Sequence, residues 1–178
     1  MNVIGTKLSE CVIIEPKVFG DDRGFFLETF QAERYAQLTS IELPFVQDNH
    51  SRSSKGVLRG LHFQVTRPQG KLVRVVRGEV FDVAVDIRPG SSTYGQWEAV
   101  ILSEENKKQF WIPPGFAHGF IVTSDFADFE YKCTDYYDPH DEGSLLWNDP
   151  SLCITWPIDN PILSKKDSQA PCLADIVR

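Results

Sequence analysis

The chain of 178 residues is 42% hydrophobic and 24% charged, which is typical of one globular domain spanning residues 1–178. Its 18 Lys and Arg against 25 Asp and Glu give a formal net charge of −7, which disfavours nucleic acids and anionic membrane surfaces as partners. No apolar run approaches the ~18 residues of a membrane span and no signal-peptide pattern precedes residue 20, so we expect a cytoplasmic protein.

Short apolar or alternating runs, broken by Gly, Pro, Asn and Ser, predict strands of an antiparallel sandwich or barrel. In chain order we expect strands at 11–14, 24–30, 56–64, 71–76, 79–87, 97–102, 110–112, 118–123 and 129–135. Arg77 and Gly78 separate two β-branched runs, which predicts a hairpin there. A helix is expected over 31–38 and a short turn within 168–176. Residues 138–178 lack a clear period and are expected to wrap over the barrel as loops.

Two motifs carry the first functional information. The spacing Gly56-x5-His62-x-Gln64-x6-Lys71-x6-Gly78 and the segment Pro113-x-Gly-x-x-His118 resemble the two motifs of cupins, which implies an all-β, cupin-type double-stranded antiparallel jelly roll with a few short helices. Metal-binding cupins place His and Glu ligands where this chain has Gln64, a weak neutral ligand, and Lys71, a cation. The four cysteines show no C-x-x-C spacing and are read as buried thiols. We therefore expect a site without metal or cofactor.

Longer segments narrow the resemblance and together cover nearly the whole chain: Asp22-Arg23-Gly24-Phe25-Phe26-x-Glu28, Gln47-x-Asn49-x-Ser51, Arg59-Gly60-Leu61-His62, Lys71-Leu-Val-Arg, Asp86-Ile-Arg88, Tyr131-Lys-Cys-Thr-Asp-Tyr136-Tyr137 and Leu163-Ser-x-Lys-Asp167. With the two motifs above, they resemble the dTDP-4-dehydrorhamnose 3,5-epimerase family. The resemblance implies epimerisation of dTDP-4-dehydro-6-deoxy-D-glucose at C3 and C5, through enolates, to dTDP-4-dehydro-L-rhamnose.

Such a reaction needs a base, an acid on the opposite face of the sugar and a group that stabilises the enolate oxygen. His62 is the candidate base because histidine titrates near neutral pH, and the resemblance implies that Asp167 orients it. Lys71 alternates with Val73 and Val75, so we expect its ammonium to face the interior, where a developing enolate would partner it. The resemblance makes Tyr131 the acid, since its phenol can protonate an enolate.

The remaining candidates concern binding. Arg23 and Arg59 resemble the family pair that holds the diphosphate, and Phe19 and Tyr137 the aromatic residues that hold the thymine. Further family contact positions are occupied by Phe26, Glu28, Gln47, Asn49 and His118. The resemblance also implies a homodimer in which the N-terminal part, with Phe19, Arg23 and Phe26, serves the pocket of the neighbouring subunit.

A regular strand would turn Arg59 and His62 to opposite faces, because they are three residues apart, so a shared site requires a bulge or bend at Gly60. Three other functions stay open. The chain could be a relative that inverts one carbon or isomerises the keto group, a metal cupin oxygenase or isomerase, or a nucleotide-sugar binding module without catalysis. Gln64 and Lys71 argue against the metal enzyme, and the set His62, Lys71, Tyr131 and Asp167 exceeds what binding alone requires.

Overall fold

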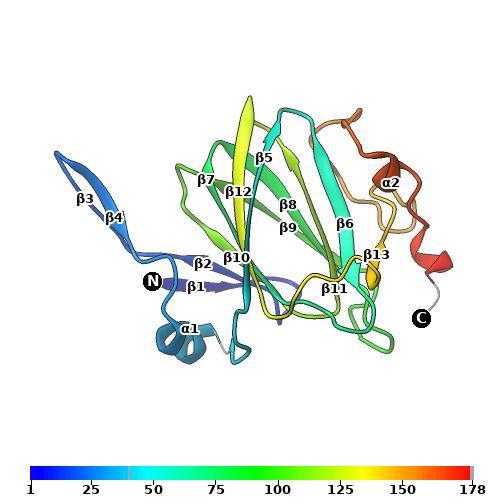
Figure 1. Ribbon diagram of the computed structural model, residues 1–178, viewed down its shortest axis with the longest axis horizontal. Helices are drawn as coiled ribbons and strands as arrows, with labels where there is room; N and C mark the ends of the chain where they lie inside the picture. Colours follow the sequence, from blue (N-terminus) through cyan, green and yellow to red (C-terminus); the bar gives the residue numbers. More distant parts are fainter. Residues whose placement is uncertain (40, 177–178) are drawn as a thin grey trace.

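The computed structural model describes residues 1–39 and 41–176, and its main body is a pair of antiparallel sheets packed face to face (Figure 1). The large sheet runs in the order β1 (Asn2–Gly5), β2 (Val12–Glu15), β10 (Gln109–Ile112), β7 (Lys71–Arg77), β12 (Phe126–Cys133) and β5 (Gln47–Ser54). The small sheet runs in the order β13 (Glu142–Ser144), β6 (Leu58–Gln64), β11 (Phe116–Val122), β8 (Glu79–Asp86) and β9 (Trp97–Ser103). The predicted cupin-type jelly roll is confirmed.

Alternation along the strands builds the core between the sheets. Val73 and Val75 of the large sheet pack in one buried cluster with Val80, Ala84 and Phe120 of the small sheet. Every second residue of these strands therefore faces the opposite sheet, as the period of a strand requires. Polar residues at the same positions near one end of the strands open this interior into a cavity.

The outer face of each sheet is covered by a different segment. Helix α1 (Ala32–Thr39) packs Tyr35 against Ile14, Leu72 and Trp111 of the large sheet. The tail carries α2 (Lys165–Ser168) and the 3-10 helix η1 (Leu173–Asp175), and it lies at the right of the molecule in Figure 1. Its apolar side chains pack against the small sheet. The tail thus gains a fixed position on the barrel although its sequence has no regular period.

The predicted hairpin at Arg77 and Gly78 is wrong. Strands β7 and β8 do not pair: β7 lies between β10 and β12 in the large sheet, whereas β8 lies between β11 and β9 in the small one. Gly78 alone connects them, with a φ of +76°, and a Cβ there would lie 2.0 Å from the carbonyl oxygen of Phe126. The glycine is required because the chain turns from one sheet to the other in a single residue, which a two-residue hairpin loop does not do.

Strands β1, β5 and β13 were not expected from the sequence, nor was β3 (Val18–Asp21). Strand β4 (Gly24–Leu27) is shorter than the predicted 24–30. Strands β3 and β4 pair only with each other in the described structure, and Figure 1 shows this hairpin, hereafter the arm, projecting from the body. Its aromatic side chains Phe19 and Phe26 are 54% and 70% exposed. No helix in the described part of the chain has the length and apolar character needed to cross a bilayer.

Candidate active site

A histidine–carboxylate pair joins the small sheet to the tail. His62 on β6 and Asp167 on α2 approach to 2.6 Å between Nε2 and Oδ1, across 105 residues of sequence. Ser164 caps the helix by accepting a hydrogen bond from the backbone N–H of Asp167 at 3.0 Å, which fixes the start of α2. Burial alone would raise the pKa of Asp167, but hydrogen bonds and the His62 charge bring it below its ordinary value. An ionised carboxylate therefore faces the imidazole and leaves Nδ1 as its free nitrogen.

Lys71 and Tyr131 reach the same space from the large sheet. Tyr131 pairs with Val73 and Cys133 with Lys71 across β12 and β7, so both side chains share the inward face. Burial lowers the pKa of Lys71 and raises that of Tyr131 to about 12, so the phenol keeps its proton at neutral pH. Among the described residues, neither the ammonium nor the phenol has a hydrogen-bond partner. Both remain available to a bound molecule.

Gly60 is the irregular point that brings Arg59 and His62 to one cavity. The register of β6 against β11 shifts here, and Gly60 adopts a φ of +129°. A Cβ at Gly60 would lie 2.5 Å from the Cα of Gly119, so the two backbones approach more closely than any side chain permits. The irregularity expected at Gly60 is confirmed, and Arg59 and His62 line the same pocket.

The cavity between the sheets consists of two adjoining pockets of about 450 and 340 Å³, which share His62, Lys71, Tyr131 and Glu142. The larger pocket also contains Arg59, His118 and Asp167, and the smaller contains Gln47, Asn49 and Tyr137. Nine of the thirteen residues singled out in the sequence thus meet in one cavity. Its floor comes from both sheets, so a bound sugar would have His62 on one side and Tyr131 on the other.

Gln64 occupies the cupin ligand position but serves the loop that follows β12. Its amide nitrogen donates to the carbonyl oxygens of Arg67 and Tyr136 at 2.8 and 3.2 Å, and its oxygen accepts from the backbone N–H of Asp138 at 2.8 Å. These bonds hold Tyr137 at the edge of the cavity. Within residues 1–39 and 41–176, no group of three or more His, Cys, Asp or Glu side chains is arranged to hold a metal ion.

Glu142 and Lys166 belong to the cavity and were missed as site residues. Glu142 accepts from Lys166 at 2.5 Å and from the Tyr137 hydroxyl at 2.9 Å, and it lies 3.9 Å from Nδ1 of His62. Burial would raise the pKa of Glu142, but these two hydrogen bonds bring it below its ordinary value. Lys166 stands next to Asp167 in a segment already quoted for the resemblance, which was a usable signal. Glu142 lies on a strand of three residues that no pattern announces.

Phe19, Arg23, Phe26 and Glu28 are not brought to this cavity within the chain. The first three line a separate pocket of the arm, where Arg23 forms an exposed ion pair with Asp21. Glu28 pairs with Arg34 at 2.6 Å. These four predicted contacts are therefore absent from the cavity in the described part of the chain.

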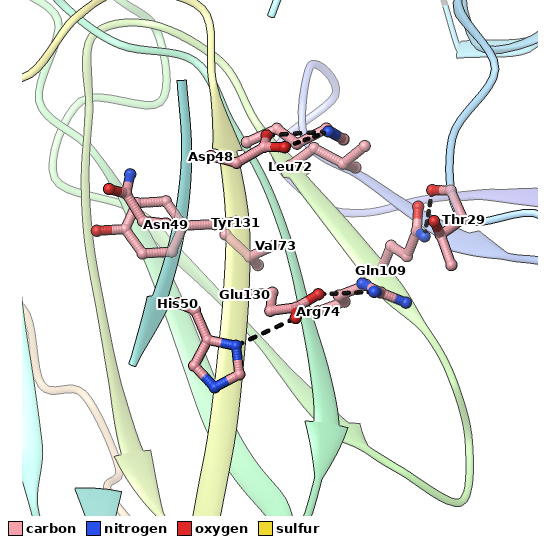
Figure 2. Close-up of a pocket in the computed structure, with 11 residues that line it drawn as sticks. Thr29, Asp48, Asn49, His50, Leu72, Val73, Arg74, Gln109, Glu130 and Tyr131 are labelled. Carbon is pink, nitrogen blue, oxygen red and sulfur yellow. Dashed lines mark hydrogen bonds and ion pairs between the residues drawn. The ribbon is translucent and has the colours of Figure 1, made fainter. Parts of the chain in front are cut away.

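Another pocket of about 340 Å³ lies on the outer face of the large sheet, and Figure 2 shows its side chains. Glu130 bonds to both His50 and Arg74, at 3.1 and 2.6 Å, while Tyr131 and Asn49 extend to the other side of the strands (Figure 2). Its charges are largely paired with one another, so this pocket offers less to a ligand than the cavity between the sheets.

Comparison with known proteins identifies the family. The family model described as dTDP-4-dehydrorhamnose 3,5-epimerase matches residues 5–175. The dTDP-4-dehydrorhamnose 3,5-epimerase of Salmonella typhimurium strain LT2 is 57% identical over 97% of this chain and 96% of its own. A dTDP-6-deoxy-D-glucose-3,5-epimerase from Legionella pneumophila, solved in complex with dTDP-4-keto-L-rhamnose, superimposes with a TM-score of 0.97, 62% identity, and coverage of 99% of this chain and 94% of its own. A 3′-monoepimerase from Streptomyces bikiniensis in complex with dTDP-quinovose is 36% identical, with a TM-score of 0.89 over 96% of this chain and 87% of its own. The chain belongs to the dTDP-4-dehydrorhamnose 3,5-epimerase family.

Proposed function

We propose that this protein epimerises dTDP-4-dehydro-6-deoxy-D-glucose at C3 and C5 and releases dTDP-4-dehydro-L-rhamnose, without a metal ion or cofactor. The observation that carries the proposal is the 2.6 Å pair of His62 and Asp167 facing Lys71 and Tyr131 in one cavity. A binding module would need neither an oriented base nor a protonated phenol opposite to it. Membership of the family supports the substrate.

His62 is the base in this proposal, and Nδ1 takes the proton because Nε2 is bonded to Asp167. The carboxylate stabilises the imidazolium that forms. Removal of the proton leaves an enolate, whose oxygen receives a hydrogen bond from the Lys71 ammonium. One such donor lowers the barrier by roughly 3–4 kcal/mol.

Tyr131 lies on the opposite sheet and returns a proton to the other face of the carbon, which inverts it. The pKa of about 12 keeps the phenol protonated until the enolate forms. After one inversion His62 holds an extra proton and Tyr131 lacks one, so the two must be reset through solvent or through the sugar before the next carbon reacts. Arg59, His118, Gln47, Asn49 and Tyr137 are the proposed substrate contacts within the subunit.

The deciding experiment uses the purified protein and dTDP-4-dehydro-6-deoxy-D-glucose in D2O, followed by NMR. Deuterium at C3 and C5 together with product of L configuration is expected. Deuterium at one carbon only would favour the second candidate, a single-carbon epimerase, which the similarity to a 3′-monoepimerase keeps in view. No deuterium at either carbon would refute both and leave a binding protein.

We also infer that the protein is a homodimer whose arm completes the cavity of the neighbouring subunit. An isolated two-stranded hairpin is marginally stable in water, and this one exposes Phe19, Phe25 and Phe26. Arg23 would supply the neighbour with a forked donor for a phosphate. A doubly charged sugar nucleotide does not cross a bilayer unaided, which supports a cytoplasmic location for the single-domain enzyme that uses it.

Mixed dimers test the exchange of arms. A dimer of one Arg23→Ala chain and one His62→Ala chain has one intact site if each arm serves the neighbour, since the His62-containing barrel receives the Arg23-containing arm. It has no intact site if each arm serves its own barrel. Recovery of activity on mixing is therefore expected, and its absence in verified mixed dimers would refute the exchange.

A further inference from the structure

Besides Asp167, a second carboxylate, that of Asp82, is buried between the two sheets. Asp82 lies on β8 opposite Phe120 and Val100, is 0% exposed, and shares its face of the strand with Val80 and Ala84. Both of its oxygens contact Nε2 of His118, at 3.1 and 2.9 Å. In the described part of the chain no Lys or Arg lies within ion-pairing distance of it. A carboxylate in such surroundings is strongly unfavourable unless its charge is balanced.

Lys71, on the facing sheet, is a buried cation that lacks a paired carboxylate among the described residues. Its ammonium is desolvated by burial, which lowers its pKa, and it forms no ion pair with a described residue. Asp82 and Glu142 are the carboxylates whose charge favours its ionised form. Glu142 is already paired with Lys166 and hydrogen-bonded to Tyr137, so its charge is largely taken up. Asp82 is left as the carboxylate without another cation.

His118 is not the cation that balances the negative charge of Asp82. Burial lowers the pKa of His118, and the charges of Lys71 and His62 oppose its protonation further, against the pull of Asp82. A neutral His118 donates its Nε2 proton to the carboxylate and keeps Nδ1 as an acceptor. The other titratable groups that line this cavity are His62 and Arg59 of β6, Tyr131 of β12, Tyr137 of the loop after β12, Glu142 of β13, and Lys166 and Asp167 of α2, with Cys133 paired to Lys71.

We propose that Asp82 is a positioning residue for the reaction: it holds His118 as the Nε2–H tautomer and supplies the negative charge that keeps Lys71 an ammonium in the cavity. This rests on the proposed role of Lys71 in stabilising the enolate. A sugar hydroxyl would then donate to Nδ1 of His118, while the keto oxygen accepts from Lys71. The two side chains thus select opposite hydrogen-bonding groups on the substrate.

Asp82→Asn tests the charge, because it preserves the shape and an oxygen that can accept from Nε2. Asp86→Asn is the matched control: Asp86 is also 0% exposed and lies on the same strand, but it bonds to Arg88, Ser91 and Thr93 away from the cavity. We expect the alkaline limb of the kcat profile of Asp82→Asn to move at least about one pH unit lower, since Lys71 loses its ammonium form more easily. On the alkaline side of the limb of the unmodified protein, kcat should then be about 10-fold lower in Asp82→Asn, with a smaller change in KM. In Asp86→Asn the thermal midpoint should fall and the alkaline limb should stay.

An unmoved alkaline limb in a folded Asp82→Asn variant, or equal movement in both variants, would overturn the proposal. Two NMR measurements on the unmodified protein need neither turnover nor a folded variant. At neutral pH the ring nitrogens of His118 should report a neutral Nε2–H tautomer, and the Lys71 Cε signal should show an ammonium. A His118 imidazolium, an Nδ1–H tautomer or a neutral Lys71 would refute it. These signals are read without substrate, so they stand even if the unmodified protein fails to epimerise the sugar.

Discussion

The bond between His62 and Asp167 permits a quantitative prediction. A hydrogen bond to a charged group contributes about 1.5–3 kcal/mol against about 0.5–1.5 kcal/mol for a neutral one, so Asp167→Asn removes about 1–1.5 kcal/mol from the imidazolium. That difference corresponds to a rate loss of about 5- to 13-fold. The amide NH2 can also donate to Nε2, which would leave the proton on Nδ1, the nitrogen assigned as base. We therefore expect a total loss of ~10- to 10²-fold in kcat for Asp167→Asn.

The assay is the appearance of deuterium at C3 and C5 of the sugar in D2O, measured by NMR beside the rate of epimer formation. Asp149→Asn is the matched control, because Asp149 is also 3% exposed and lies in the same tail, where it accepts from the backbone N–H of Leu173 at 2.6 Å. This control should lose stability and keep its exchange rate. Full exchange in a folded Asp167→Asn variant, or an equal loss in Asp149→Asn, would refute the role of the dyad.

Four further outcomes are expected. His62→Ala should slow exchange at both carbons at least ~10²-fold, with an unchanged circular dichroism spectrum as the check on folding. Tyr131→Phe should keep exchange and lose inversion, since the enolate still forms but no phenol protonates its other face; equal losses of both rates would contradict that assignment. Activity should survive exhaustive chelation, whereas loss of activity with EDTA and its rescue by one divalent ion would favour the alternative of a metal-dependent cupin enzyme. Burial would raise the pKa of Asp86, but hydrogen bonds hold it well below its ordinary value, so this carboxylate stabilises the fold above about pH 4 and ceases to as acid protonates it. Urea unfolding of Asp86→Asn should accordingly depend less on pH below about pH 4 than that of the unmodified protein.

The sequence predicted the strands that alternate apolar residues and missed those that do not. Strand β5 reads Gln-Asp-Asn-His-Ser-Arg-Ser-Ser, because its inward residues line a polar cavity and its outward residues form a charged face. No hydrophobic period can reveal such a strand. The hairpin at Gly78 failed for another reason: local spacing allows two strands to pair but does not say whether they share a sheet.

In the candidate site, the sequence indicated a residue's position best where its chemistry did not fit the expected strand pattern. Lys71 in an apolar run and the three-residue offset of Arg59 and His62 were visible in the sequence and are borne out by the geometry. Asp167 required the family resemblance, because no local pattern relates it to His62. The roles of Glu142 and Asp82 depend on their contacts with residues of other strands. Those contacts are set by pairing between distant segments, which the local sequence does not reveal.

Because Asp167 lies in the tail, the ribosome synthesises the two members of the dyad at different times. A ribosome adds about 5–20 residues per second, so at least roughly 5–20 s separate the synthesis of His62 from that of its partner 105 residues later. The last strand, β13, ends at Ser144, so in the final part of that interval every strand of the barrel has been synthesised, yet the imidazole has no carboxylate beside it. A nascent or prematurely terminated chain can therefore possess the strands of the barrel without the dyad, and full competence to remove a proton requires the synthesis of Asp167.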